Sequence, residues 1–197
     1  MPETTYHVYS RCIEWKPLMA DCEARNLMLH TLKRTQHKYC FDLVFYEIMD
    51  SHFHMVIKTL TGEATISRIM QYFKARYAES FNRRVKRIGP FWNERFKDTI
   101  ADEAADPHGF VLKLLWYLAY NPVRNKMVSD PRDYRHGSLR HYLGSNKQAE
   151  PRITPHATFL SLGFTNEARI RKFLLVEREY LKSGHRWHKA LRKGQSP

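Results

Sequence analysis

The sequence predicts an α+β fold in which helices cover one face of an antiparallel central sheet. Segments of strand and helix character follow one another in the order strand, helix, strand, strand, helix, strand. This is the element order of a ferredoxin-like split β-α-β sandwich. Strand segments are rich in Tyr, Val, Ile and Phe, whereas helix segments repeat apolar residues at three- and four-residue steps. A polar segment then precedes a C-terminal helical extension.

Composition indicates one domain that binds an anionic partner. The 197 residues suffice for one domain with an appendage, and 43% hydrophobic residues suffice for a core. A net charge of +13 and a pI near 9.8 favour nucleic acid as the partner. The three cysteines form no C-x-x-C pair, which indicates a reduced cytoplasmic setting. No run reaches the roughly 18 apolar residues of a membrane span, so no membrane association is expected.

The first three elements are justified by local signals. Residues 4–13 alternate loosely and predict a strand ending near Arg11. Asp21 is a suitable N-cap for a helix that extends to about residue 37. Residues 40–49 predict a second strand, and Asp50 with Ser51 forms a tight turn into the third.

The third strand carries two histidines one residue apart. Because side chains alternate along a strand, His52 and His54 share one face while Phe53 and Met55 share the other. Two imidazoles on one face offer nitrogen ligands to a divalent metal, and a third ligand must come from elsewhere.

A long amphipathic helix follows over residues 63–84, with apolar positions such as Ile66, Phe73 and Tyr77 on one face. The opposite face is basic, and the basic run continues into residues 89–96, where aromatic residues interleave with cations. Such interleaving is typical of base stacking beside phosphate contacts, although a basic helix face can also be merely solvated. Residues 95–100 predict the fourth strand.

The next helix is predicted from an acidic lead-in that ends at Asp106. On this helix Lys113, Tyr117 and Asn121 are spaced by four and fall on nearly one side. Pro122 means that Asn121 either ends this helix or caps a following one.

The remaining chain predicts a linker and an extension. The domain boundaries are a main domain at 1–143, a linker at 144–156, and a C-terminal helix with a basic tail at 157–197. Thr165 caps the helix, which is expected to turn Phe173 and Leu181 inward and to end near Gly184. Residues 182–197 carry several cations and no acid, which indicates a mobile basic tail.

Several blocks together resemble the REP-associated tyrosine transposases, single-tyrosine members of the histidine-hydrophobic-histidine (HUH) nucleases. The blocks are YHVYSR at 6–11, MDSHFHMVI at 49–57, FWNERF at 91–96, YLAYNPVR at 117–124, DYR at 133–135 and LGFT at 162–165. One departure is Met49-Asp50-Ser51, where the family usually has Met-Pro-Asn. The departure alters the hairpin turn and could add a carboxylate near the metal.

The resemblance implies a metal-dependent single-strand DNA endonuclease and strand transferase that acts near hairpins such as repetitive extragenic palindromes. Tyr117 would be the nucleophile and would form a 5′-phosphotyrosine intermediate, while His52, His54 and Asn121 would hold Mg²⁺ or Mn²⁺. The location would be the cytoplasm, on the nucleoid, and the protein would act as a monomer or homodimer. The expected DNA contacts are Arg11, Lys74, Arg83, Arg84, Trp92, Arg95 and Lys97.

Alternatives remain open at this level. Tyr120, one turn away, is a rival nucleophile, although the four-residue spacing to Asn121 favours Tyr117. Asn121 could serve only as a helix cap, and a tyrosine on an amphipathic helix usually packs. A different class of function is a DNA- or RNA-hairpin-binding protein that keeps the fold without cleaving.

Overall fold

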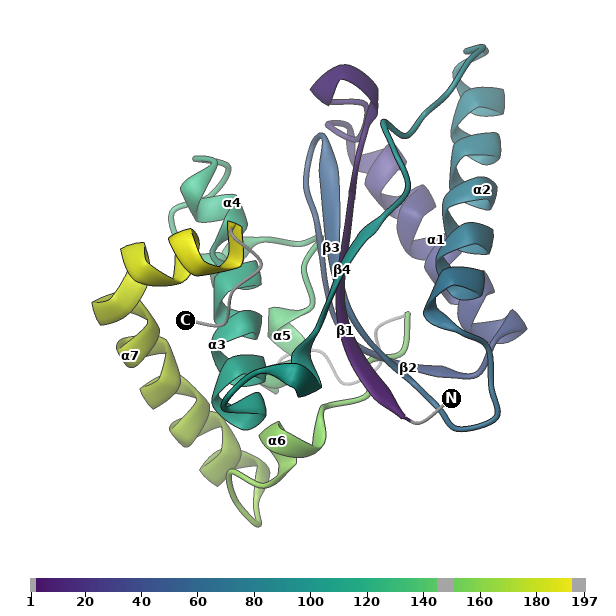
Figure 1. Ribbon diagram of the computed structural model, residues 1–197. Helices are drawn as coiled ribbons and strands as arrows, with labels where there is room; N and C mark the ends of the chain where they lie inside the picture. The colour runs from purple at the N-terminus through teal and green to yellow at the C-terminus, as the bar shows by residue number, and fades with distance from the viewer. Residues whose placement is uncertain (1–2, 145–150, 193–197) are drawn as a thin grey trace.

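A computed structural model describes residues 3–144 and 151–192, with side chains described up to residue 183. Its sheet is antiparallel and four-stranded in the order β2-β3-β1-β4. The strands are β1 (Thr4–Arg11), β2 (Phe41–Ile48), β3 (His52–Thr59) and β4 (Lys97–Ile100). With one helix after β1 and one after β3, this is the predicted ferredoxin-like split β-α-β arrangement (Figure 1).

The first face of the sheet is covered by α1 (Cys22–Lys38) and α2 (Ile66–Arg84) (Figure 1). The side chain of Asp21 accepts a hydrogen bond from the backbone N–H of Ala24, so it caps α1 as predicted. Thr65 caps α2 in the same way, and that helix begins three residues later than expected. The predicted apolar stripe of α2 is buried against Phe53, Met55 and Ile57 of β3 in the first of two hydrophobic clusters.

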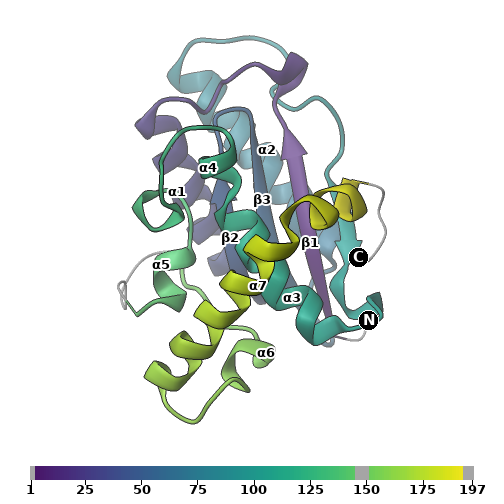
Figure 2. The same ribbon diagram turned by 90° about the vertical axis from the view of Figure 1, so that its left-hand side faces the viewer.

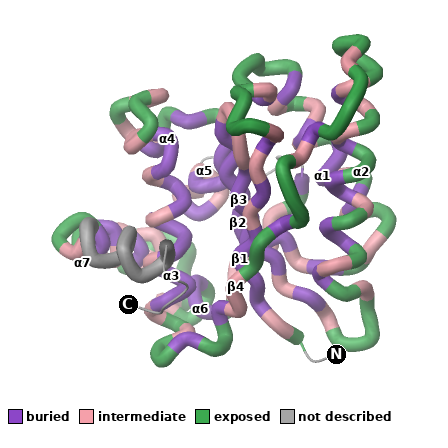
Figure 3. The backbone as a smooth tube through the Cα atoms, turned by 45° about the horizontal axis from the view of Figure 1, so that its top comes forward, coloured by how far each residue is buried: buried purple, intermediate pink, exposed green. Residues whose placement is uncertain are grey.

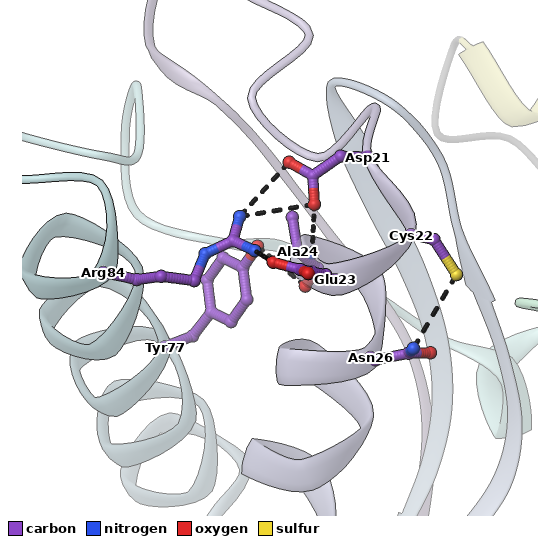
Figure 4. A network of polar contacts seen from close by, with 7 residues as sticks. All are labelled: Asp21, Cys22, Glu23, Ala24, Asn26, Tyr77 and Arg84. Atoms are coloured by element: carbon purple, nitrogen blue, oxygen red, sulfur yellow. Dashed lines mark hydrogen bonds and ion pairs between the residues drawn. The ribbon is translucent and has the colours of Figure 1, made fainter.

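A polar network ties α1 to α2 at one end of this layer (Figure 4). Arg84 near the end of α2 donates to Asp21 and to Glu23 at the start of α1. The hydroxyl of Tyr77 donates to the carbonyl of Ala24 at 3.2 Å. These contacts fix the two helices relative to each other.

The opposite face of the sheet is also covered, whereas the sequence predicted helices on one face only. The covering helices are α3 (Pro107–Ala119), α4 (Asn121–Arg124), α5 (Leu139–Tyr142), α6 (Ala157–Leu160) and α7 (Asn166–Arg192) (Figures 1 and 2). Short 3₁₀ turns lie at Ile13–Trp15, Ala101–Glu103 and Pro131–Asp133. Because α3 lies between the sheet and α7 (Figure 1), eight of its 13 residues are buried, and all eight belong to the second cluster. Figure 3 colours the backbone by burial.

The C-terminal helix differs from the sequence expectation in two respects. Thr165 precedes α7 and accepts from the N–H of Ala168, as a cap should, but the helix continues past Gly184 to Arg192. A glycine inside a helix costs only about 1 kcal/mol, which does not force a helix to end. Leu181 is 54% exposed, whereas Tyr180 is buried and takes the inward position.

Parts of two predicted segments lie outside the described residues. For the linker at 144–156 this concerns residues 145–150, and for the basic tail at 182–197 it concerns residues 193–197. The described part of the linker lies against the sheet, because the N–H of Thr154 donates to the carbonyl of Leu43 at 2.9 Å. Among the described helices, none has the length and apolar character required to cross a membrane.

Candidate active site

His52 and His54 lie on the face of the sheet that α3 covers. Their neighbours Phe53 and Met55 belong to the first cluster, whereas Val56 belongs to the second. The two imidazole rings meet edge to face with centroids 5.1 Å apart. The strand alternation therefore brings the histidines together as predicted, at the beginning of β3 beside the turn.

Both imidazoles are held neutral. Burial, with the nearby charge of Arg11, lowers the pKa of His52 to about 4. Burial also lowers the pKa of His54 well below its ordinary value, and its neighbours His52 and His7 add to this effect. A neutral ring keeps the lone pair that a metal ligand needs.

Asp50, in the turn before His52, forms an ion pair with Arg25 of α1. The backbone carbonyl of Asp50 accepts from the N–H of Met19 at 2.8 Å. Asp50, which departs from the Met-Pro-Asn pattern, thus has its ion-pair partner Arg25 on a helix that covers the first face of the sheet.

A row of side chains crosses the sheet through His54. Glu47 on β2 and Tyr9 on β1 are its direct cross-strand partners, and Lys97 on β4 is the partner of Tyr9. Glu47 is 1% exposed, and burial raises the pKa of its carboxyl well above the ordinary value. Its Oε1 is buried without a hydrogen-bond partner among the described residues. Gly137 closes over it, since a Cβ there would fall 2.3 Å from Oε1.

Tyr117 and Asn121 lie where α3 gives way to α4. The helix ends at Ala119, and Asn121 is the first residue of α4, followed by Pro122. Tyr120 occupies the N-cap position. Asn121 therefore neither ends the first helix nor caps the second, as the sequence had suggested, but is the first residue of α4. Asn121 is buried and Tyr117 is half-buried against the second cluster.

Arg124 joins these two residues. Its Nη2 donates to the backbone oxygen of Tyr117 and to Oδ1 of Asn121, each at 2.7 Å. Its guanidinium carbon lies 4.5 Å from the centroid of the Tyr117 ring. The charge of Arg124 also contributes to the lowered pKa of His54 and opposes the raised pKa of Glu47. The α3–α4 residues and the strand residues therefore belong to one electrostatic site.

Tyr120 is directed away from this site. Its hydroxyl donates to Oε1 of Glu177 on α7 at 2.7 Å, and its ring packs near Trp116 and Tyr180. Burial and the Glu177 carboxylate raise the pKa of Tyr120 above its ordinary value. This environment is typical of a packing tyrosine.

The residues present fit a divalent ion of the type the sequence suggested. The amide oxygen is a carbonyl-type donor of the kind that Mg²⁺ and Mn²⁺ prefer, and neutral imidazole is the commonest side-chain ligand of metal ions in general. Oδ1 of Asn121 accepts one bond from Arg124 and retains a second lone pair. Within residues 3–144 and 151–192, no three His, Cys, Asp or Glu side chains form a metal-binding group, so a third ligand beside the two histidines would be of another kind, such as the amide oxygen of Asn121.

Of the predicted DNA contacts, Arg11 and Lys97 share the face of the histidines. Arg11 is paired with His52 across the strands, and its guanidinium lies 3.8 Å from the Trp15 ring centroid. Lys97 is exposed and forms an ion pair with Glu94 at 3.2 Å.

The other predicted contacts lie with α2 or the segment beside it, on the first-face side. Trp92 packs against Phe53 and Phe91 and donates its Nε1–H to the carbonyl of Lys74. The Lys74 amine donates to the carbonyl of Glu94, and burial lowers its pKa to about 8. The arginines also have polar partners within the protein, which are Glu79 for Arg83, Asp21 and Glu23 for Arg84, and Ser67 for Arg95.

Three residues of the site were not assigned a role from the sequence. Arg124 closes the YLAYNPVR block, seven residues after Tyr117, and His7 lies in the YHVYSR block. Glu47 is the one acid in the apolar stretch from residue 43 to residue 49, a pattern that indicates a buried carboxyl.

Comparison with known proteins adds a family and a fold. A family model described as transposase, IS200-like, matches residues 1–106, a range that contains both histidines and ends before Tyr117. No curated protein sequence matches the chain. A solved REP-associated tyrosine transposase bound to a REP hairpin is similar, with 13% identity, a TM-score of 0.61 and coverage of 80% of this chain and 92% of that chain. A Deinococcus radiodurans protein described as a transposase shares 13% identity, with a TM-score of 0.40 and coverage of 50% and 78%.

Proposed function

Because this chain belongs to the IS200-like transposase family, we propose that it cleaves and rejoins single-stranded DNA beside hairpins, with Tyr117 as the nucleophile. In this proposal His52, His54 and Asn121 hold Mg²⁺ or Mn²⁺. The hairpin substrate is suggested by the REP hairpin bound to the REP-associated transposase of similar fold.

The contact of Arg124 with both Tyr117 and Asn121 is the observation that carries the proposal. It holds the proposed nucleophile and the proposed third ligand in fixed positions, on the side of the sheet to which His52 and His54 point. Positioning of this kind is a large part of catalysis in phosphoryl transfer. The alternative nucleophile Tyr120 is engaged by Glu177.

The proposed reaction transfers a phosphodiester to tyrosine. The phenol oxygen of Tyr117 bonds to the scissile phosphorus as the bond to the 3′-oxygen breaks, and the phenol proton ends on the released 3′-hydroxyl. The DNA is left attached through a 5′-phosphotyrosine, so attack by another 3′-hydroxyl rejoins strands without ATP. A bound divalent ion would supply charge neutralisation at the phosphate, which offsets the weak nucleophilicity of a phenol.

The test is formation of a covalent protein–DNA adduct. The protein is incubated with Mg²⁺ or Mn²⁺ and single strands that carry a hairpin and a label at the 3′ end, then analysed by denaturing electrophoresis. The label should migrate with the protein, because the downstream fragment is the one that stays attached. Chelation of the metal should abolish the adduct.

Matched tyrosine variants identify the nucleophile. We expect Tyr117→Phe to lose the adduct while binding DNA with unchanged affinity, and Tyr120→Phe to keep it. An adduct formed by Tyr117→Phe would contradict the assignment. Binding without any adduct from the parent protein would instead favour a non-cleaving hairpin-binding protein.

A further inference from the structure

His7 contacts the proposed metal ligand His54 inside the protein. Nε2 of His7 lies 3.0 Å from Nδ1 of His54, a hydrogen-bond distance. The two rings are stacked with centroids 5.2 Å apart, and they are 6% and 8% exposed. Nothing in the established family membership or in the roles implied by sequence assigns a function to His7.

The hydrogen bond between His7 and His54 determines the protonation of the other ring nitrogen of His54, Nε2. A neutral imidazole carries one N–H, so one of the two rings donates and the other accepts. If His54 donated from Nδ1, its Nε2 would keep a lone pair for a metal. If His7 donated instead, the proton of His54 would be on Nε2, and that nitrogen could not bind a metal. The tautomer of this pair therefore decides whether His54 can be a ligand.

We propose that His7 is a positioning residue that accepts a hydrogen bond from Nδ1–H of His54 and thereby presents Nε2 of His54 to the metal. This inference rests on the proposed function, since it assumes that His54 is a ligand. Metal-bound histidines commonly donate their second N–H to a neighbouring acceptor, which fixes the ring and its tautomer.

The backbone holds His7 rigidly enough for this role. β1 lies between β3 and β4, so His7 is paired on both sides, with Val56 and with Thr99. The ring of Tyr9 lies beside both histidines. Its centroid is 6.1 Å from that of His7 and 5.7 Å from that of His54. Little freedom remains for the His54 ring to rotate away from His7.

Nuclear magnetic resonance of the ¹⁵N-labelled parent protein without metal tests the tautomer directly. We expect both rings as Nδ1–H tautomers, with Nε2 of His54 unprotonated. A proton on Nε2 of His54 would overturn the proposal. This measurement needs no substitution, so it does not depend on whether a variant folds.

Metal affinity tests the positioning role. Mn²⁺ binding is followed by electron paramagnetic resonance for the parent, His7→Gln and His7→Leu. His7→Leu should bind Mn²⁺ about 10–100-fold more weakly, and His7→Gln should recover most of the affinity, because its amide oxygen can accept the same hydrogen bond. Equal affinity of His7→Leu and the parent would overturn the role of His7 alone. A parent protein that binds no Mn²⁺ would overturn the proposed metal site, and the role of His7 with it.

Discussion

At the residue scale, Arg124 contacts both Tyr117 and Asn121, and its charge also acts on His54 and Glu47 in the sheet. Its side chain serves three acceptors, since Nη1 also donates to the hydroxyl of Tyr180 at 2.9 Å. Burial lowers the pKa of Arg124, but the ordinary pKa of a guanidinium is so high that the group is always charged in proteins. These three contacts use the planar guanidinium group, whose N–H donors have a fixed geometry. The ammonium group of a lysine cannot reproduce that geometry.

We therefore expect Arg124→Lys to slow adduct formation about 10-fold or more, as is typical when a positioning side chain is replaced. DNA affinity should change little, because the charge is retained. The measurement is the single-turnover rate of adduct formation at saturating labelled hairpin, with binding titrated separately. Arg171→Lys on the exposed side of α7 is the control and should match the parent. An unchanged rate for Arg124→Lys would argue against a positioning role.

At the scale of elements, α3 depends on α7 for its position. Phe173 of α7 stacks on Trp116 of α3 with ring centroids 4.6 Å apart, and the Trp116 Nε1–H donates to the backbone oxygen of Phe173. Phe173 is fully buried, whereas Leu175, two residues further on, is 51% exposed. The helix that carries Tyr117 is thus clamped between the sheet and α7.

Truncation of Phe173 should consequently destabilise the whole protein. We expect Phe173→Ala to lower the free energy of unfolding by about 3–5 kcal/mol, the usual cost for a buried aromatic side chain. Leu175→Ala on the outer side of the same helix should change it by less than about 0.5 kcal/mol. Urea denaturation followed by circular dichroism measures both. Equal, small effects would mean that α7 is not part of the cooperative unit.

At the scale of the whole molecule, the net charge of +13 is not equally available to DNA. Arg84 is engaged by two carboxylates, Asp21 and Glu23 (Figure 4). Arg11 and Lys97 lie on the face of His52 and His54, where the guanidinium of Arg11 lies over the rings of Tyr9 and Trp15 and Lys97 is exposed beside a single carboxylate, Glu94. The contribution of each cation to DNA binding should therefore depend on its position relative to the site, rather than on the total number of cations in the chain.

Salt dependence distinguishes these cations. For single-stranded DNA, each phosphate that a cation neutralises adds about 0.7 to the magnitude of the slope of log affinity against log salt. We expect Arg11→Gln and Lys97→Gln each to reduce the slope by about that amount, and Arg84→Gln to leave it unchanged. Fluorescence anisotropy of a labelled hairpin between low and moderate salt gives the slopes. The opposite ranking would place the DNA on the α1–α2 side of the sheet.

The sequence by itself determined what depends on local geometry. The period of a strand places His52 and His54 opposite Phe53 and Met55, and the hydrogen-bonding needs of helix ends identify Asp21 and Thr165 as caps. The element order and its apolar patterns were enough for the split β-α-β class, because each element must bury its apolar side.

Only the tertiary structure decided which side chains meet. His7 and His54 are 47 residues apart in sequence, and Arg124 and Tyr180 are 56 apart. These contacts exist because β1 pairs with β3 and because α7 packs on α3, and neither pairing leaves a local pattern. The same reason explains why Trp92, whose surroundings in the sequence suggest base stacking, packs half-buried against the first cluster. Local periodicity fixes the face a residue occupies within its own element, whereas its partner depends on how distant elements pack.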